Sequence, residues 1–333
     1  MSDWPHVRLH VVTGKGGTGK TTVAAALALA LASSGQQVLL CEAEGRQGIA
    51  RLFDVPPLPY EERSVALGSE GGEVHALAID PEAALLEYLD MYYHLGRAGR
   101  ALDRFGVVDF VTTIAPGLRD VLLTGKVYEA YRRRHKKDKT WVYDAIVLDA
   151  PPTGRITQFL NVNTEVAGLA KMGPIRNQSD SIMDVLRSEG TAVHLVTLLE
   201  DMPVQETLDA AEELDAIGLQ VGSMIVNQLR MSPLDDDTRK ALGDQRLAAP
   251  TLVGALGDAG LPGRGVAVGA EELAEGLVAA GAAHVERLTL EAALRETVER
   301  SGRPVCTLPL LTDGVDLGAL YDLAESLCAQ GLV

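Results

Sequence analysis

The sequence is short of aromatic residues, cysteines and positive charge. Aromatic side chains make up only 4% of its 333 residues while Gly is abundant, a composition typical of helices packed closely on a sheet. The three cysteines, Cys41, Cys306 and Cys328, are widely spaced and odd in number, which excludes both a disulfide framework and a CxxC zinc site. We therefore expect a reducing, cytoplasmic compartment.

The chain carries 30 Lys and Arg against 46 Asp and Glu, a net charge of −16. Proteins bind nucleic acid mainly through basic side chains. The excess of acidic residues therefore argues against nucleic-acid binding. One basic run departs from this trend: Arg132, Arg133, Arg134, His135, Lys136, Lys137 and Lys139. This basic run is interpreted in one of two ways. It is either a solvated helix end before a buried strand or a site for an anionic partner.

Long hydrophobic segments are missing as well. The longest apolar stretch, Val23–Ala32, is Ala-rich and far shorter than the roughly 20 residues that span a bilayer. The N-terminus has Asp3 and His6 where a signal peptide needs basic and then apolar residues. We expect a protein that neither spans a membrane nor is secreted.

The chain opens with a β-α-β pattern. The β-branched run Val7–Val12 predicts a strand, a glycine-rich turn follows from Gly14, and Lys20–Ser33 predicts a helix that Gly35 ends. A second strand is predicted at Gln37–Cys41. Such a unit requires a parallel sheet.

Alternating strands and helices continue to the end of the chain. Further strands are predicted at Val74–Ile79, Trp141–Leu148, Ala192–Leu198, Val221–Val226 and Pro304–Leu308. This alternation indicates an α/β fold with a doubly wound, mostly parallel sheet. We expect a single domain over 1–333, with an α-helical subdomain inserted at strand ends from residues 80–140 and 160–190. No internal repeat was found.

The turn after the first strand matches G-x-x-x-x-G-K-[ST], the P-loop of nucleotide-binding proteins. Its residues are Gly14, Lys15, Gly16, Gly17, Thr18, Gly19, Lys20, Thr21 and Thr22. Glycines let backbone N–H groups surround the phosphates, and the helix N-terminus adds partial positive charge. The motif predicts that Lys20 reaches the β- and γ-phosphates of ATP and that the Thr21 hydroxyl binds Mg²⁺.

A second lysine, Lys15, gives the loop the form KGGTGKT. This resembles the deviant Walker A signature, in which that lysine reaches the phosphates of a facing subunit in the manner of an arginine finger. The resemblance implies a dimer, with hydrolysis stabilised in trans. The alternative is a solvent-exposed lysine in a loop.

A further resemblance begins at Ala145–Asp149, an apolar run that ends in a carboxylate as a Walker B strand does. It continues into Ala150-Pro151-Pro152-Thr153-Gly154-Arg155, which is similar to the DTAPTGH stretch, switch II, of the ArsA-like anion-pump and tail-anchored-protein targeting ATPases. The resemblance implies a P-loop NTPase fold, ATP and Mg²⁺ as ligands, and Asp149 as a metal-holding residue together with Thr21.

Later motifs extend the resemblance over nearly the whole chain. Ala76–Pro81 is similar to the A-x-E-I-D-P strand end of the family, Ile225–Gln228 to its adenine-side V-N-Q, and Leu308–Leu311 to its late nucleotide-base loop. By this match Asn227 should hydrogen-bond the adenine edge and Pro309 should lie beside the base. For Asn227 the alternative is a helix cap or turn residue.

Switch I departs from the family pattern S-T-D-P-A-H-x-L-x-D-x-F. Counting back from Phe53, Glu44 stands where the family has its water-orienting Asp. The carboxylate is one methylene longer, so hydrolysis stays chemically possible, and the catalytic residues implied are Lys15, Lys20 and Glu44. In switch I, Arg46 replaces a small residue of the family pattern, and in switch II, Arg155 replaces a His. We hypothesise that one of these arginines senses or neutralises the γ-phosphate.

We interpret the chain as an enzyme, a Mg-ATP hydrolysing ATPase that couples dimer opening and closing to a client or partner. The second subunit is either identical or a paralogous ATPase, and the client or membrane partner is not identified by the sequence. One alternative is a catalytically weak, ATP-binding regulatory subunit paired with an active paralogue. Another is a ParA- or MinD-like positioning ATPase, although Asp316–Gln330 is acidic rather than a basic membrane helix.

Neither zinc nor arsenite chemistry is supported by the ligand types present. The histidines are dispersed along the chain, and no cysteine cluster exists that could bind a metalloid through soft thiolates. Met91, Met172 and Met183 lie in the predicted helical insertions, and scattered methionines are more typical of core packing than of a client groove.

Overall fold

The computed structural model describes residues 3–93, 116–161, 174–261, 268–312 and 314–333. Contacts divide the chain into two compact units, residues 1–229 with 301–333 and residues 230–300. The sequence analysis expected one domain and did not set the second unit apart. No helix among the described residues is both long and apolar enough to cross a membrane.

The first unit is built on an eight-stranded sheet of order β3-β4-β2-β5-β1-β6-β7-β8. Its strands are β1 Leu9–Gly14, β2 Gln37–Glu42, β3 Arg63–Leu67, β4 Glu73–Ala78, β5 Ala145–Asp149, β6 Thr191–Thr197, β7 Val221–Leu229 and β8 Val305–Pro309. All neighbours pair in parallel except β3 and β4, which are antiparallel. The α/β fold with a mostly parallel sheet is therefore confirmed.

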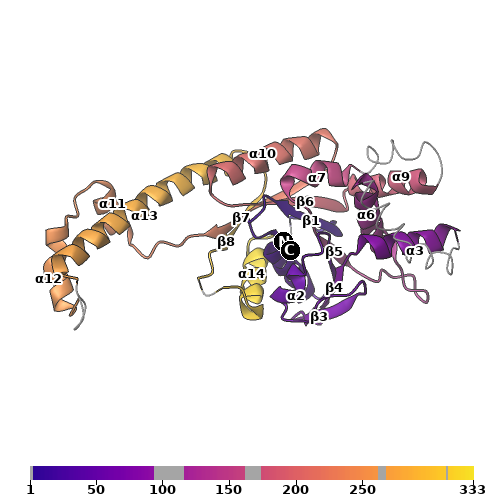
Figure 1. Ribbon diagram of the computed structural model, residues 1–333, viewed down its shortest axis with the longest axis horizontal. Helices are drawn as coiled ribbons and strands as arrows, with labels where there is room; N and C mark the ends of the chain where they lie inside the picture. The colour runs from indigo at the N-terminus through magenta and orange to yellow at the C-terminus, as the bar shows by residue number, and fades with distance from the viewer. Residues whose placement is uncertain (1–2, 94–115, 162–173, 262–267, 313) are drawn as a thin grey trace. The chain divides into compact units, whose positions relative to one another are not determined.

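Helices cover both faces of this sheet (Figure 1). They are α1 Lys20–Ser33, α2 Gly48–Leu52, α3 Pro81–Tyr93, α6 Pro116–Arg132, α7 Thr153–Leu160, α9 Pro174–Leu186, α10 Asp201–Ala216 and α14 Leu317–Ala329. Figure 1 shows α14 on one side of the central strands and α7 and α10 on the other. Because parallel strands end at one edge, the loops after β1, β2 and β5 meet there.

Helix α1 explains the apolar stretch that is too short for a membrane. Every residue of Val23–Ala32 is at most 4% exposed, because the helix lies between the sheet and α14. Its many alanines have no side-chain entropy to lose, and they let α14 approach closely. This dense packing holds the start of α1, and with it the P-loop, in a fixed position.

Two strand predictions need correction. The edge strand β3 was not predicted, because its side chains are mostly exposed and its sequence lacks an apolar alternation. The predicted strand Trp141–Leu148 begins only at Ala145. Trp141 instead lies under two guanidinium groups, with Arg134 3.5 Å and Arg8 3.9 Å from its ring centroid.

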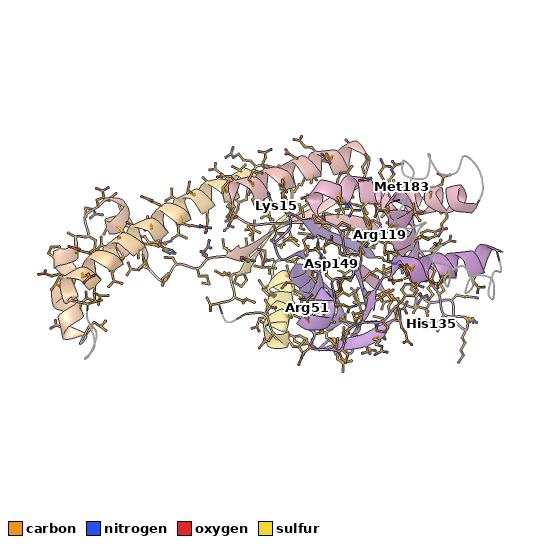
Figure 2. The ribbon with its side chains drawn as sticks, viewed as in Figure 1. Lys15, Arg51, Arg119, His135, Asp149 and Met183 are labelled. Atoms are coloured by element: carbon orange, nitrogen blue, oxygen red, sulfur yellow. The ribbon has the colours of Figure 1, made fainter. Side chains whose placement is uncertain are left out.

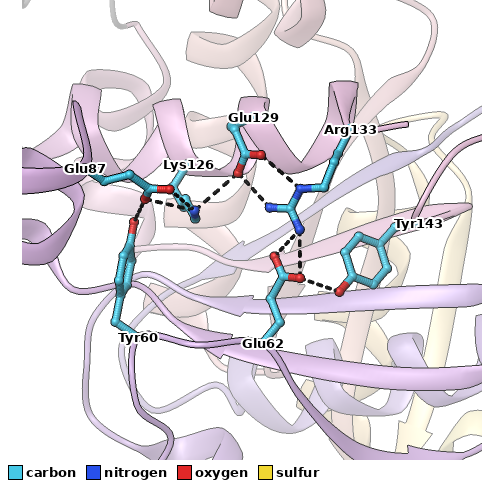
Figure 3. Close-up of polar contacts among 7 residues, drawn as sticks. All are labelled: Tyr60, Glu62, Glu87, Lys126, Glu129, Arg133 and Tyr143. Atoms are coloured by element: carbon cyan, nitrogen blue, oxygen red, sulfur yellow. Dashed lines mark hydrogen bonds and ion pairs between the residues drawn. The ribbon is translucent and has the colours of Figure 1, made fainter. Parts of the chain in front are cut away.

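A chain of charged and polar side chains ties the helical insertion to the sheet (Figure 3). Its members are Tyr60, Glu62, Glu87, Lys126, Glu129, Arg133 and Tyr143. Lys126 lies 2.9 Å from Glu87 of α3 and 3.3 Å from Glu129 of α6. Arg133 joins Glu129 at 2.7 Å to Glu62, before β3, at 2.6 Å.

The basic run begins where α6 ends, as its helix-end interpretation expects. Arg133 forms ion pairs with two carboxylates of the network in Figure 3, within the chain itself. Of the insertion methionines, Met183 is buried in the core at 1% exposure. Met172 and the side chain of Met91 lie outside the described residues.

Two histidines that are far apart in the sequence meet inside the sheet. His10 Nδ1 and His194 Nε2 lie 3.1 Å apart with stacked rings, and His194 Nδ1 accepts a hydrogen bond from the Ser223 amide. Burial lowers the pKa of His10 to about 4 and that of His194 well below its usual value. Both imidazoles are therefore neutral near pH 7 and act as core residues.

In its described residues, the second unit has three helices, α11 Asp236–Gly243, α12 Ala249–Asp258 and α13 Ala270–Glu299. Both shorter helices pack on α13. Glu291, which is buried, accepts from Arg230 at 2.7 Å and from Arg287 at 3.2 Å. The two arginines compensate the charge of the buried Glu291 carboxylate within the unit.

Candidate nucleotide site

The P-loop connects β1 to α1 at the edge where the parallel strands end. Gly19 has φ +86°, and a Cβ there would lie 2.4 Å from the side-chain nitrogen of Asn227. A Cβ on Gly14 would lie 2.2 Å from the carbonyl oxygen of Val196. Both positions therefore require glycine for the loop to keep this shape.

Asn227 lies beneath the loop and not only beside it. Its side-chain nitrogen donates to the carbonyl of Thr18 at 2.9 Å, and the residue is 6% exposed. Asn227 therefore braces the P-loop from β7, a role that the sequence did not predict. Pro309, at the end of the neighbouring strand β8, pairs with Leu229 of β7. Contacts of either residue with adenine stay predictions.

A cavity of about 260 Å³ opens in front of the P-loop. It is lined by Gly17, Gly19, Lys20, Thr21, Glu42, Glu44, Arg46 and Asp149. Lys20 begins α1, is 9% exposed and is one of the lining residues. The structure thus brings together the predicted phosphate-binding, metal-holding and switch I residues.

The predicted metal residues are in direct contact. Thr21 Oγ1 donates to Asp149 Oδ2 at 2.7 Å, while Asp149 Oδ1 is buried with no hydrogen-bond partner. Burial raises the pKa of Asp149 to about 7, with Glu42 and Glu44 adding to the rise and the Thr21 bond and Lys20 opposing it. A hydroxyl beside a carboxylate with a free oxygen suits Mg²⁺, which takes few protein ligands.

This donor set fits the way Mg²⁺ binds with nucleotides. Among the residues that the structure describes, no group of three or more His, Cys, Asp or Glu side chains could hold a metal. The Thr21 hydroxyl and the Asp149 carboxylate are the groups that would hold Mg²⁺ here, where it would neutralise phosphate charge.

Switch I residues also line the cavity. The Glu44 side chain is 24% exposed, and its carboxylate lies 3.6 Å from the guanidinium of Arg46, which is 72% exposed. Glu42, the last residue of β2, is 2% exposed and lies in register with Asp149 of β5. The sequence analysis did not single out Glu42, although a carboxylate that ends a parallel strand was a visible signal.

Lys15 is bound within its own chain. Its Nζ lies 2.6 Å from Glu206 Oε1 of α10, with the two side chains 31% and 37% exposed. Among the described residues, those lining the cavity do not include Lys15. Figure 2 labels Lys15, which follows β1, and Asp149, which ends β5. No sequence signal pointed to Glu206, which is 191 positions from Lys15.

Arg155 does not line the cavity described here. Its guanidinium lies 3.4 Å from the carboxylate of Asp120, a residue of α6 whose side chain is 5% exposed. Switch II is also bound to the P-loop strand, because Thr13 Oγ1 donates to the carbonyl of Pro151 at 2.6 Å. Of the two arginines considered as phosphate sensors, only Arg46 lies at the cavity.

Comparison with known proteins agrees with this geometry. A family model described as anion-transporting ATPase matches residues 7–189, which is more than half of the chain. The chain belongs to the anion-transporting ATPase family. The matched residues hold the P-loop, both switches and Asp149, and the family resemblance expected from the sequence is confirmed.

The family's members include close and distant relatives of this chain. ATPase BagA of Mycobacterium tuberculosis is 53% identical over 333 residues, covering 99% of this chain and 96% of its own length. ATPase GET3 of Kluyveromyces lactis is 25% identical over 259 residues, covering 68% and 73%. A protein of Prosthecochloris vibrioformis, provisionally named an arsenical pump-driving ATPase, is 26% identical over 265 residues, covering 67% and 61%. The chain is accordingly an ATPase with a P-loop fold.

Proposed function

We propose that the chain binds Mg-ATP in the cavity of the P-loop and hydrolyses it with Glu44 orienting the attacking water. Lys20 binds the β- and γ-phosphates, and the P-loop amides surround them. Thr21 and Asp149 hold Mg²⁺, which when bound neutralises charge on the phosphate oxygens. The contact of Thr21 with Asp149 in front of Lys20 is the observation that carries this assignment.

Glu44 is placed to act on water at the end of the phosphate chain. It lines the same cavity as Lys20 and stays partly solvent-accessible, as a residue that orients water must. Its neighbour Arg46 is free to turn toward a phosphate because it is mostly exposed. We assign Arg46 rather than Arg155 to sensing or neutralising the γ-phosphate.

The active form we propose is a dimer, either of identical chains or with a paralogous ATPase. Lys15 stands outside the cavity of its own subunit, held by Glu206. A signature lysine in that place is available to a facing subunit, where it would stabilise charge that develops on the transferred phosphoryl group. We place this cycle in the cytoplasm.

Nucleotide turnover is proposed to act on the helical insertion and, through it, on a client protein or a membrane partner. Asp149 holds the metal at the start of switch II, and switch II leads into α7. Arg155 of α7 pairs with Asp120 of α6. A displacement of switch II on hydrolysis would therefore be carried to α6, and from there to a surface bound by the partner.

A regulatory subunit with weak catalysis is the second candidate. The observation that favours it is the contact of Glu44 with Arg46, since an engaged carboxylate is less available to orient water. Steady-state phosphate release by the purified chain, alone and with a paralogous subunit, separates the two functions.

The lysines give the sharpest test of the proposal. Lys20→Ala should abolish Mg-ATP binding, because the side-chain cation within the subunit is lost. Lys15→Ala should keep binding and lose hydrolysis. Lys240→Ala, which changes an exposed lysine of α11, is the matched control and should behave as the wild type.

Mixing the two variants tests action in trans. A mixed dimer of Lys15→Ala and Lys20→Ala chains has one complete site, with nucleotide in the first chain and Lys15 from the second. Recovery of phosphate release on mixing is the expected result. Inactive mixtures, or loss of binding by Lys15→Ala itself, would show that Lys15 acts within its own subunit.

A further inference from the structure

Glu42 is a buried carboxylate to which neither the P-loop nor the metal site assigns a role. It ends β2, lines the nucleotide cavity and is 2% exposed. A buried carboxylate is costly unless hydrogen bonds or opposite charge compensate it. Its hydrogen bonds therefore indicate what it does.

Both carboxylate oxygens face the start of α2. Oε1 accepts from the Gly48 amide at 3.3 Å, and Oε2 accepts from the Ile49 amide at 3.4 Å. The first N–H groups of a helix have no acceptor within the helix. Gln47 stands at the cap position without a capping side-chain bond, so Glu42 takes the place of the missing cap.

Helix α2 depends on such support. It has only five residues, and helices of that length are unstable on their own because nucleation is costly. Ile49 is fully buried and fixes one face of the helix, while Glu42 fixes its first turn. Loss of the carboxylate should leave α2 docked through Ile49 but fraying at Gly48.

The segment between Glu42 and α2 is the switch I loop, residues 43–47. Its far end is held by Gln47, whose side chain donates to the Leu58 carbonyl at 3.0 Å and accepts from the Leu58 amide at 2.7 Å. Glu44 and Arg46 lie between these fixed ends, on either side of Gly45, which has φ +64°. Because hydrogen bonds hold both ends of the switch I loop, Glu44 can move only a limited distance from the phosphate position.

We propose that Glu42 is a positioning residue for ATP hydrolysis, holding the start of α2 so that the switch I loop presents Glu44 to the attacking water. The inference rests on the proposed role of Glu44. Glu42 does not touch the reacting atoms, and it acts through the backbone of Gly48 and Ile49.

The first test measures the bond itself. Glu42→Gln keeps the shape but removes the charge and offers one acceptor oxygen instead of two. Amide hydrogen exchange at Gly48 and Ile49 should quicken by about fivefold in the nucleotide-free chain, as expected for losing one weak bond to a charged acceptor. Asp235→Asn removes a capping charge from α11 and is the matched control, without effect at α2.

The second test asks whether Glu42 works through Glu44. Glu42→Gln should lower kcat about fivefold with KM for Mg-ATP nearly unchanged, because Lys20 and the P-loop remain. In the background of Glu44→Gln the same change should have no further effect on kcat. An additive loss would mean that Glu42 acts independently of Glu44 and would overturn the proposal.

The two failures are distinguishable. Unchanged amide exchange at Gly48 and Ile49 in Glu42→Gln overturns the inference whether or not the chain turns over ATP. Unchanged turnover in Glu44→Gln refutes the assignment of Glu44 and, with it, the positioning role. Should Glu42→Gln not fold, Glu42→Ser, with the residue that the family pattern has there, is the second variant for the same measurements.

Discussion

Replacing Glu206 with Gln should free Lys15 and favour the ATP-bound dimer. The ion pair is short, 2.6 Å, but its side chains are 31% and 37% exposed. Solvent screens such a pair, so its loss releases about 0.5–1 kcal/mol of restraint. A dimer of identical chains breaks two such pairs, so the two restraints together correspond to a dimer dissociation constant about five- to thirtyfold lower in the presence of Mg-ATP.

The assay is sedimentation equilibrium of chains that also carry Glu44→Gln, so that nucleotide is not consumed. The effect should shrink at high salt, because the screening length falls to about 3 Å at 1 M salt, close to the separation of this exposed pair. Asp209→Asn removes the same charge from the exposed face of α10, where Asp209 bonds only Gln205 in the described hydrogen bonds, and is the matched control. A dissociation constant that is unchanged, or that shifts equally in the control, would refute the idea that Glu206 restrains Lys15.

Four further results are expected. Because the pKa of Asp149 is raised to about 7, Mg²⁺ affinity measured by titration should fall about tenfold per pH unit below that value. For the same reason, the metal-free chain gains stability from protonated Asp149 that is lost as pH rises from 3.8 to about 7, and Asp149→Asn should remove this slope in chemical unfolding. Arg155→Ala should lower the unfolding free energy by about 1 kcal/mol, and Asp120→Asn should cancel part of that loss, since the guanidinium is 53% exposed and the carboxylate 5%. Asn227→Ala removes the hydrogen bond to the Thr18 carbonyl, so ATP affinity should fall about fivefold in a binding titration. Unchanged affinity would mean that the P-loop keeps its shape without this bond.

The features that the sequence predicted are those encoded by neighbouring residues. The P-loop is a local motif between a strand and a helix, and Gly14–Thr22 takes the expected shape. Asp149 could be placed beside Thr21 because parallel strands end at one edge. Strand β3 was not predicted, because this exposed edge strand has no alternation of apolar and polar residues.

What the sequence could not predict depends on contacts between distant residues. Glu206 meets Lys15 across 191 positions, and Asp120 meets Arg155 across 35, with no pattern that marks either pair. The buried pair His10 and His194 also comes from strand pairing alone, although its residues had been taken as dispersed. The sequence analysis did not set the unit of residues 230–300 apart, and its limits come from contacts in the structure.

Turnover by the wild-type chain and by Glu44→Gln tests the central claim most directly. Steady-state phosphate release should be measured for both, alone and with any paralogous subunit, alongside an ATP-binding titration. We expect the wild type to release phosphate and Glu44→Gln to bind ATP equally while turning over about 10²-fold more slowly. Wild-type chains that release no phosphate in either setting, with Glu44→Gln indistinguishable from them, would contradict the account and leave ATP as a structural or signalling ligand.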